Sequence, residues 1–183
     1  MGVTIHFEGK LKSEEDFNKV MEIATNFAVS NNMTHNYFED ENKILGRVKD
    51  EEEWEYEGPT KGLFIQPDDN TEYLNLEFDK DLYVQEFCKT QFADPSVHIL
   101  IVDLLRQIQP HFEKLNVEDE GEYWETSDLI KLQANMDACF EMMEEAREEN
   151  KDLIGPILTE HGRIIDLMDD AGDEEDEEST NEN

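Results

Sequence analysis

The stretch from Asp94 to Pro110 constrains the fold more than any other part of the chain. Its apolar residues recur at helical spacing and leave only a narrow polar strip, so the helix must be covered over most of its circumference. Asp94 before Pro95 is typical of a helix N-terminus, and Pro110 ends the run. We therefore expect a central helix around which the other elements pack. Its apolar positions are Val97, Ile99, Leu100, Ile101, Val102, Leu104, Leu105 and Ile108.

Four further segments have clear patterns. Alternation over residues 3–11 predicts a strand with one covered face. Ser13, followed by Asp16, resembles a capping box and opens an amphipathic helix that ends at residues 30–32. Two alternating runs within residues 63–78 predict a hairpin. A long amphipathic helix, capped by Thr126 or Ser127, carries a stripe that we expect to be buried. The stripe is Leu129, Leu132, Met136, Cys139, Phe140 and Met143.

The remaining segments have weaker patterns. Residues 34–48 suggest short strands separated by a turn at residues 39–42. Residues 79–92 are rich in aromatic side chains and suggest a loop or short helix that packs over the core. We expect a last sheet strand at residues 114–117 and a terminal hairpin within residues 157–167.

These elements predict an α+β protein. We expect a single domain over residues 1–168, with an antiparallel or mixed sheet of about five to seven strands packed by two or three helices. Residues 169–183 are almost entirely acidic and polar, and we expect a disordered acidic tail there. The chain of 183 residues is long enough to bury a hydrophobic core without disulfides or a structural metal.

The net charge limits the classes of partner. The chain has 48 acidic and 15 basic residues, a formal net charge of −33. Residues 169–183 hold nine of the acids and no base, so residues 1–168 still carry a net charge of −24. Nucleic acids and anionic membranes are bound through clustered Lys and Arg, so we expect no direct binding to either. The charge favours a basic protein partner, although it also serves solubility alone.

The two cysteines, Cys88 and Cys139, have no CxxC spacing and lie in apolar surroundings, so we expect small buried side chains rather than a nucleophile. The sequence shows neither a signal peptide nor a run of about 20 apolar residues that could span a membrane. We therefore expect a cytoplasmic protein.

Sequence motifs for common chemistry are missing. The glycines form neither a Walker loop nor a GxGxxG turn, and there is no GxSxG elbow, HExxH pair or EF-hand loop. We expect no catalytic residue, cofactor or metal site. His98 falls on the apolar face of the central helix, which favours a hydrogen-bonded core histidine. His6 and Glu8 share one strand face, where a carboxylate could orient an imidazole, although such neighbours also arise by chance on so acidic a chain.

Two acidic segments enclose aromatic residues and are the candidate partner-binding sites. Tryptophan and tyrosine are frequent anchors at interfaces, and carboxylates can bind Lys and Arg of a partner. The alternative is that the aromatic residues face the core while the acids face water. The first segment comprises Glu51, Glu52, Glu53, Trp54, Glu55 and Tyr56. The second comprises Glu118, Asp119, Glu120, Glu122, Tyr123 and Trp124.

Three stretches, residues 2–11, 81–87 and 162–168, together resemble a family of small acidic bacterial proteins whose function is uncharacterised. The resemblance covers most of the chain except the tail. It implies no reaction, cofactor or site residue. In charge alone the chain is similar to immunity proteins that neutralise basic toxins and to acidic proteins that mimic DNA.

The sequence thus favours a non-enzymatic interaction protein that binds a basic protein, such as a nuclease toxin neutralised in the manner of an immunity protein. The alternative is a small enzyme or ligand-binding protein with a pocket beside the central helix, using His6, Glu8 or His98. A carboxylate site for a divalent metal is a third hypothesis.

Overall fold

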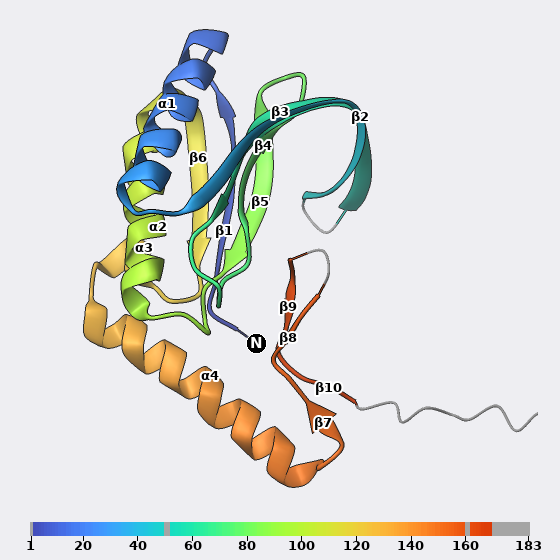
Figure 1. Cartoon of the computed structure of the whole chain (residues 1–183), viewed down its shortest axis with the longest axis vertical. Coiled ribbons are helices and arrows are strands. Elements are labelled where there is room, and N and C mark those ends of the chain that lie inside the picture. The colour runs from blue at the N-terminus through green and yellow to red at the C-terminus, as the bar shows by residue number, and fades with distance from the viewer. Residues whose placement is uncertain (1, 50–51, 160–161, 170–183) are drawn as a thin grey trace, which may run out of the picture.

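The structure is a computed structural model that describes residues 2–49, 52–159 and 162–169. A strand and a helix are followed by four consecutive strands and a second helix, and four short strands come last among the described elements (Figure 1). The elements are β1 (Thr4–Leu11), α1 (Glu14–Ser30), β2 (Thr34–Lys49), β3 (Glu52–Gln66), β4 (Leu74–Phe78), β5 (Tyr83–Lys89), α2 (Pro95–Ile108), a 3-10 turn (Gln109–His111), β6 (Phe112–Asp119), α3 (Tyr123–Thr126), α4 (Leu129–Glu149), β7 (Leu153–Ile154), β8 (Ile157–Leu158), β9 (Ile164–Ile165) and β10 (Met168–Asp169). The predicted α+β class is confirmed.

The strands form two antiparallel three-stranded sheets, β5–β1–β6 and β2–β3–β4, together with the two-stranded pairs β7–β10 and β8–β9. The two larger sheets meet where β4 turns into β5. At one end of this junction the Asp79 N–H donates to the Tyr83 carbonyl at 3.0 Å, and at the other the Glu72 N–H donates to the Lys89 carbonyl at 3.0 Å. The single sheet that the sequence predicts is therefore divided, because the β4 and β5 backbones form no continuous ladder.

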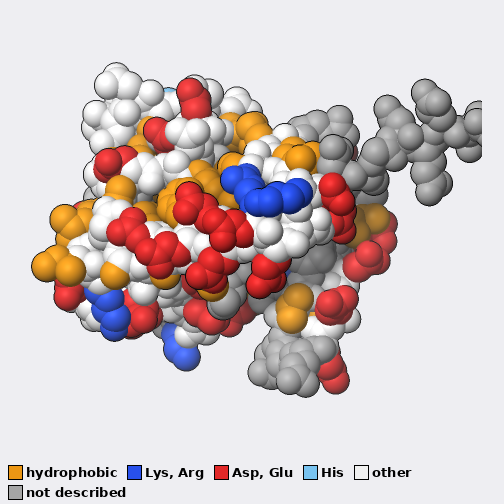
Figure 2. All heavy atoms as spheres, turned by 90° about the horizontal axis from the view of Figure 1, so that it is seen from below, with side chains coloured by type: hydrophobic (Ala, Val, Ile, Leu, Met, Phe, Trp, Pro, Cys, Tyr) orange, Lys and Arg blue, Asp and Glu red, His pale blue; other side chains and the backbone are white. Residues whose placement is uncertain are grey.

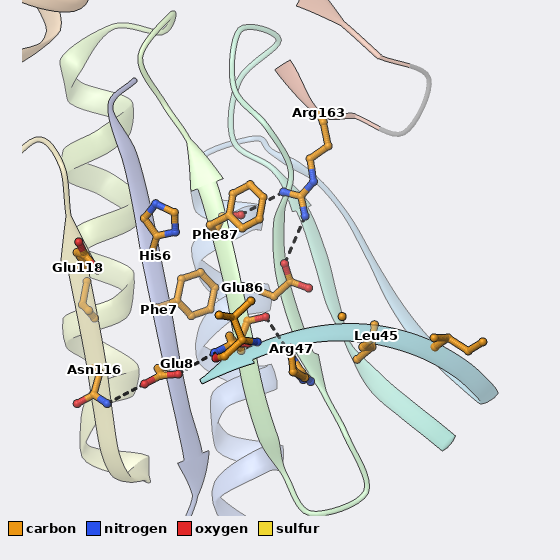
Figure 3. Close-up of a pocket in the computed structure, with 15 residues that line it drawn as sticks. His6, Phe7, Glu8, Leu45, Arg47, Glu86, Phe87, Asn116, Glu118 and Arg163 are labelled. Atoms are coloured by element: carbon orange, nitrogen blue, oxygen red, sulfur yellow. Dashed lines mark hydrogen bonds and ion pairs between the residues drawn. The ribbon is translucent and has the colours of Figure 1, made fainter. Parts of the chain in front are cut away.

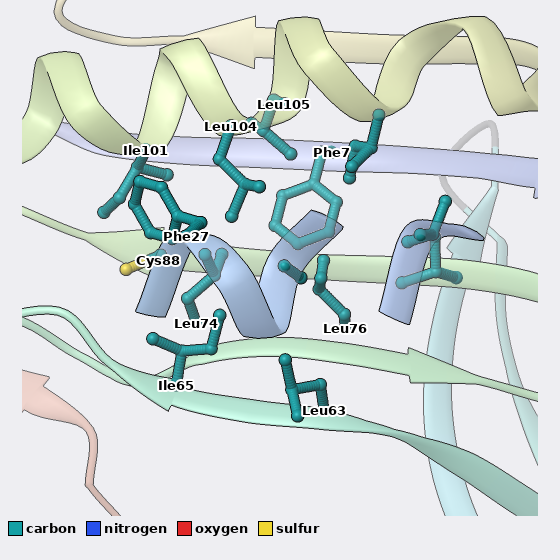
Figure 4. Packing of buried hydrophobic residues seen from close by; sticks show 14 of the residues in the cluster. Phe7, Phe27, Leu63, Ile65, Leu74, Leu76, Cys88, Ile101, Leu104 and Leu105 are labelled. Atoms are coloured by element: carbon teal, nitrogen blue, oxygen red, sulfur yellow. The ribbon is translucent and has the colours of Figure 1, made fainter. Parts of the chain in front are cut away.

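Helices α1 and α2 cover one face of these sheets (Figure 1). The Ser13 side chain accepts a hydrogen bond from the Asp16 N–H, and Asp94 caps α2 by accepting from the Ser96 N–H, as the sequence predicts. Side chains from both helices and both sheets interdigitate in one core (Figure 4). Its fully buried members include Ile5, Leu63, Ile65, Leu74, Leu76, Phe78, Ile101, Leu104 and Leu105. The predicted central helix is thus confirmed as the scaffold of the core.

A smaller cluster joins α4 to the N-terminal end of β1. It consists of Val3, Leu132, Met136 and Cys139. Three residues of the predicted α4 stripe do not belong to it: Leu129 and Phe140 are 53% and 42% exposed, and Met143 is buried beside Gln91 instead. Helix α4 lies at the end of the layered body (Figure 1), so only its central part has a surface to cover.

Residues 34–48 form one strand rather than short strands separated by a turn. β2 and β3 pair over almost their whole length, with a register shift between Asp40 and Lys43. Polar residues are tolerated throughout because much of this ribbon extends beyond the core. Beyond the β3 residues that pair with β4, the ribbon curls over the open sheet face (Figure 1). We call residues 43–49 and 52–58 the acidic arm.

Residues 79–92 contain β5 and not the predicted loop or short helix. Val84 and Cys88 are buried on the core side, while Gln85 and Phe87 lie on the opposite face. Aromatic residues on the open face concealed this alternation in the sequence. The predicted hairpin over residues 63–78 is confirmed as β3–β4, and the terminal hairpin as β8–β9. The predicted tail lies outside the described residues except for Asp169, which belongs to β10.

Candidate functional site

A groove of about 810 Å³ lies on the face of the β5–β1–β6 sheet opposite α1 and α2 (Figure 3). It is lined by residues 6–8 of β1, 44–48 of β2, 85–87 of β5, 116–118 of β6, and by Arg163. The sheet provides the floor and the acidic arm provides a wall. No residue of the central helix lines it among the residues described, so the groove differs in place from the pocket considered in the sequence analysis.

Strand register sets the polar side chains of the floor in two rows. His6 lies between Phe87 of β5 and Glu118 of β6, with the His6 and Phe87 rings 5.6 Å apart. In the next row Glu8 lies between Gln85 and Asn116. The expectation that His6 and Glu8 share a strand face is therefore confirmed, and this face is open to the groove.

The Glu8 carboxylate is the centre of a hydrogen-bonded network. Its Oε2 accepts from the Tyr83 hydroxyl at 2.9 Å and from the Gln85 Nε2 at 2.9 Å, and its Oε1 accepts from the Asn116 Nδ2 at 3.1 Å. Burial, together with this hydrogen bond and the Glu8 charge, raises the pKa of Tyr83 to about 12. A carboxylate with three donors is suited to holding its neighbours in place rather than to abstracting a proton.

The acidic arm is fixed to β5 by two residues. The Gln85 Oε1 accepts from the Val48 N–H at 2.8 Å, and the Gln85 Nε2 donates to the Val48 carbonyl at 2.7 Å. The Arg47 Nη1 donates to the Gln85 carbonyl at 2.9 Å. Arg47 is buried above the Tyr83 ring, and its Nη2 lies 4.0 Å from the Asp79 Oδ2. Its Nε and Nη2 have no hydrogen-bond partner among the described residues.

Arg163, from the loop between β8 and β9, closes the other end of the groove. Its guanidinium lies 4.0 Å from the centre of the Phe87 ring, an arrangement typical of a cation–π contact. It also forms ion pairs with Glu72 at 3.4 Å and Glu86 at 3.6 Å. Burial raises the pKa of Glu86, an effect that the Arg163 charge opposes. The positive charge of Arg163 is thus largely compensated within the groove.

The first predicted partner-binding segment lies on β3 of the arm. Glu52, Glu53 and Glu55 are exposed, and Trp54 is 47% exposed. Tyr56 is buried, and its hydroxyl donates to the Pro59 carbonyl at 2.8 Å and accepts from the Lys80 N–H at 3.2 Å. Tyr56 therefore holds the base of the arm, while the four preceding residues are available at the surface. Glu51 lies outside the described residues.

The second predicted segment is divided between several roles. Glu118 lies on the groove floor, and the Glu120 carboxylate accepts from the Thr4 N–H at 2.8 Å. Glu122 forms an ion pair with Lys131. Tyr123 and Trp124 are half-buried, and the Arg106 guanidinium lies 5.6 and 5.8 Å from their rings. Of this segment, only Glu118 shares the groove with the arm.

Asp119, also in this segment, is buried beside His98. The His98 Nε2 lies 3.1 Å from the Asp119 Oδ2, and the His98 Nδ1 lies 2.7 Å from the Thr90 Oγ1. Burial by itself raises the pKa of Asp119, but hydrogen bonds from His98 and from the Trp124 and Gly121 N–H groups outweigh it, so the pKa is lowered. Since His98 and Thr90 are fully buried, the prediction of a hydrogen-bonded core histidine is confirmed.

The cysteines and the acidic side chains are the other groups that could carry chemistry. Cys88 and Cys139 are free and buried, and burial raises the pKa of both thiols. Within the described ranges, no cluster of three or more His, Cys, Asp or Glu side chains is placed to hold a metal ion. No helix of the described part of the chain is long and apolar enough to cross a membrane.

The sequence did not point to Arg47, Gln85, Phe87 or Arg163, all of which line the groove. Arg47 lies among Ile44, Leu45 and Val48 in the sequence, but its charge gave no sign that its side chain is buried. One signal was available for Phe87 and Gln85, because they alternate with the apolar Val84 and Cys88.

Comparisons with models of protein families, with curated proteins and with solved structures find no match for this chain.

Proposed function

We propose that this chain is a non-enzymatic binding protein for a basic protein partner and that the acidic arm is its main contact surface. The observation that carries this proposal is the composition of the outer face of the arm. Here Glu53, Glu55 and Glu57 lie directly across the ladder from Val48, Gly46 and Ile44. No cation therefore faces the three carboxylates across the strand.

The exposure of these groups supports the proposal. All three carboxylates are exposed, and none forms an ion pair with another described residue. Ile44 and Val48 are 61% and 53% exposed beside them. Apolar side chains with unpaired carboxylates around them suit a partner surface that carries Lys or Arg around apolar residues.

The general surface charge would assist the approach of such a partner. Asp and Glu side chains are spread over the face on which α4 lies, with hydrophobic side chains between them (Figure 2). A field of this sign accelerates the encounter with a basic protein, while the contact at the arm sets the lifetime of the complex. A nuclease toxin or another nucleic-acid-binding protein, whose own surface is adapted to phosphate, belongs to this class of partner.

A small enzyme or ligand-binding protein is the second candidate, because His6 and Glu118 border a groove whose volume is typical of small-molecule sites. The hydrogen bonds that occupy Glu8 favour the binding function over proton transfer. The two candidates differ in their dependence on Glu53, Glu55 and Glu57, none of which lines the groove.

Affinity capture from the source cells at low ionic strength, followed by elution with increasing salt, tests the proposal. We expect a basic protein to be retained by the wild-type chain and released by salt, because screening weakens contacts between exposed charges. A variant chain with Glu53→Gln, Glu55→Gln and Glu57→Gln should release it at lower salt. Retention of no basic protein, or retention that is indifferent to salt, would overturn the proposal.

A further inference from the structure

The contact between Gln85 and Val48 reproduces with a side chain what a neighbouring strand does with its backbone. In an antiparallel pair, one residue gives an N–H and accepts at its carbonyl opposite a single partner residue. Gln85 bonds both the N–H and the carbonyl of Val48, at 2.8 and 2.7 Å. These two groups of Val48 therefore point away from β3, toward the groove.

The backbone N–H and carbonyl groups at the next alternate positions of β2 point in the same direction. Residues of an antiparallel ladder alternate between pairs that are bonded to each other and pairs that are not. Val48, Gly46 and Ile44 are opposite Glu53, Glu55 and Glu57 without a shift in register. Gly46 and Ile44 thus also direct their N–H and carbonyl groups to the outer edge of β2. No described residue outside the ladder bonds to either of them.

This edge borders the groove and has open space next to it. The groove is lined by residues 44–48 of β2 and by none of the described residues of β3, so the outer edge of β2 forms its wall. The face of the strand is open here as well, because a Cβ atom placed on Gly46 would meet no other atom within 4 Å. An exposed strand edge beside a groove is the arrangement by which proteins bind extended peptides through added β-strands.

We propose that the groove binds an extended segment of the basic partner, which adds as a strand to the edge of β2 at Ile44 and Gly46, next to Val48, whose backbone groups are already bonded to Gln85. This inference rests on the proposed function and specifies its mode of binding. In an added strand, alternate side chains face the sheet floor, where Phe87 is 36% exposed and Glu118 is exposed. The other side chains continue the outer face of the arm, close to its carboxylates. Alternating basic and apolar residues match these surroundings.

The test uses the full chain and a nine-residue peptide of alternating lysine and valine. Two peptides of the same length serve as charge controls, with glutamate or serine in place of lysine. Amide hydrogen exchange resolved by residue measures where each one binds. We expect the lysine peptide to slow exchange at Gly46 and Ile44 by at least about tenfold, since both N–H groups gain a partner. A peptide methylated on every backbone nitrogen should bind at least about tenfold more weakly.

Two substitutions at Gly46 test the β2 edge by changing the protein rather than the peptide. Gly46→Pro removes the N–H that faces the groove but takes no hydrogen-bond donor from the β2–β3 ladder. The lysine peptide should therefore bind at least about tenfold more weakly to this variant. Gly46→Ala keeps the N–H and has space for its methyl group, so its affinity should equal that of the wild type. A change in tryptophan fluorescence, to which Trp54 opposite Arg47 contributes together with Trp124, reports whether each variant keeps the arm in place.

Each other outcome has a distinct meaning. If the lysine peptide binds in a manner that depends on Glu53, Glu55 and Glu57 while Gly46 and Ile44 exchange as in the free protein, strand addition is overturned and the proposed function stands. If the serine or glutamate peptide protects the Gly46 and Ile44 amides equally well, the proposal that the partner is basic is overturned. Protection by none of the peptides, or equal binding of the methylated peptide, overturns the inference. Protection that rises with protein concentration alone assigns the edge to a second copy of the chain and overturns it also.

Discussion

The side-chain amide of Gln85 bonds to both backbone groups of Val48 and so holds the tip region of the acidic arm against β5. The same Gln85 Nε2 also donates to Glu8, which accepts from Tyr83 and Asn116. The position of the arm is thereby coupled to the polar floor of the groove. Gln85 therefore links the wall of the groove to its floor.

Gln85→Ala should release the arm without unfolding the body. The variant loses three hydrogen bonds, each of which contributes about 1 kcal/mol, and part of this is recovered by hydration of the exposed groups. We expect the free energy of unfolding to fall by about 1–2 kcal/mol and amide exchange at Val48 to accelerate. Urea denaturation and residue-resolved exchange measure the two effects.

Gln133→Ala is the matched control, because Gln133 is exposed on α4 and its side chain bonds to Asp137 alone among the described residues. It should change stability by no more than about 0.5 kcal/mol. Unchanged exchange at Val48 in Gln85→Ala would show that the glutamine does not hold the arm.

Asp119→Asn should destabilise the fold in a pH-dependent manner. The Asp119 carboxylate accepts from the Gly121 and Trp124 N–H groups at 2.7 and 2.8 Å and contacts His98, all in a buried site. Loss of these charge-assisted bonds should lower the free energy of unfolding by about 2–3 kcal/mol at neutral pH. Chemical denaturation of both proteins across the acid range measures the difference.

The direction of the pH effect follows from the lowered pKa of Asp119. Its ordinary value is 3.8, so the charged carboxylate stabilises the folded state above that pH, and this stabilisation is lost as the pH falls through the lowered value. The difference in free energy of unfolding between wild type and Asp119→Asn should therefore become smaller below about pH 3.8. A difference that stays constant down to full protonation would contradict the assignment.

Leu104→Ala tests whether α2 is the scaffold of the core. Leu104 is fully buried between the helices and sheets, so its truncation leaves a cavity and should lower the free energy of unfolding by about 2–5 kcal/mol. Ile130→Ala on α4 removes an apolar side chain that is 81% exposed and should change stability by less than about 0.5 kcal/mol. Similar losses in the two variants would mean that α2 is not the main packing element.

The sequence predicts the core better than the groove, for physical reasons. Periodic burial of Ile101 and Leu104 leaves a strong pattern because every helical turn meets the same apolar environment. Local capping signals at Ser13 and Asp94 are equally direct, since they depend on neighbours within three residues. These parts of the structure agree with the sequence analysis.

The groove depends on contacts between residues far apart in the chain, for which a sequence has no local pattern. Arg47 and Gln85 meet only because the arm curls back over β5, and a charged residue on an acidic ribbon gives no sign of burial. The second acidic segment shows the opposite case, where a composition typical of a surface includes the buried Asp119. Composition could identify which residues are acidic but not which of them face a partner.

The most direct measurement compares the affinities of two triple variants for the basic partner captured from cells. Glu53→Gln, Glu55→Gln and Glu57→Gln removes three charges from the arm, and Glu141→Gln, Glu144→Gln and Glu145→Gln removes three from the exposed side of α4. Both variants change the net charge equally. Isothermal titration calorimetry at about 50 mM and about 300 mM salt gives their dissociation constants. We predict that the arm variant binds about tenfold more weakly at low salt, as expected for three exposed ion pairs, and that the α4 variant stays within about threefold of wild type. Equal weakening in the two variants would contradict the account, because it would mean that net charge alone, and not the acidic arm, binds the partner.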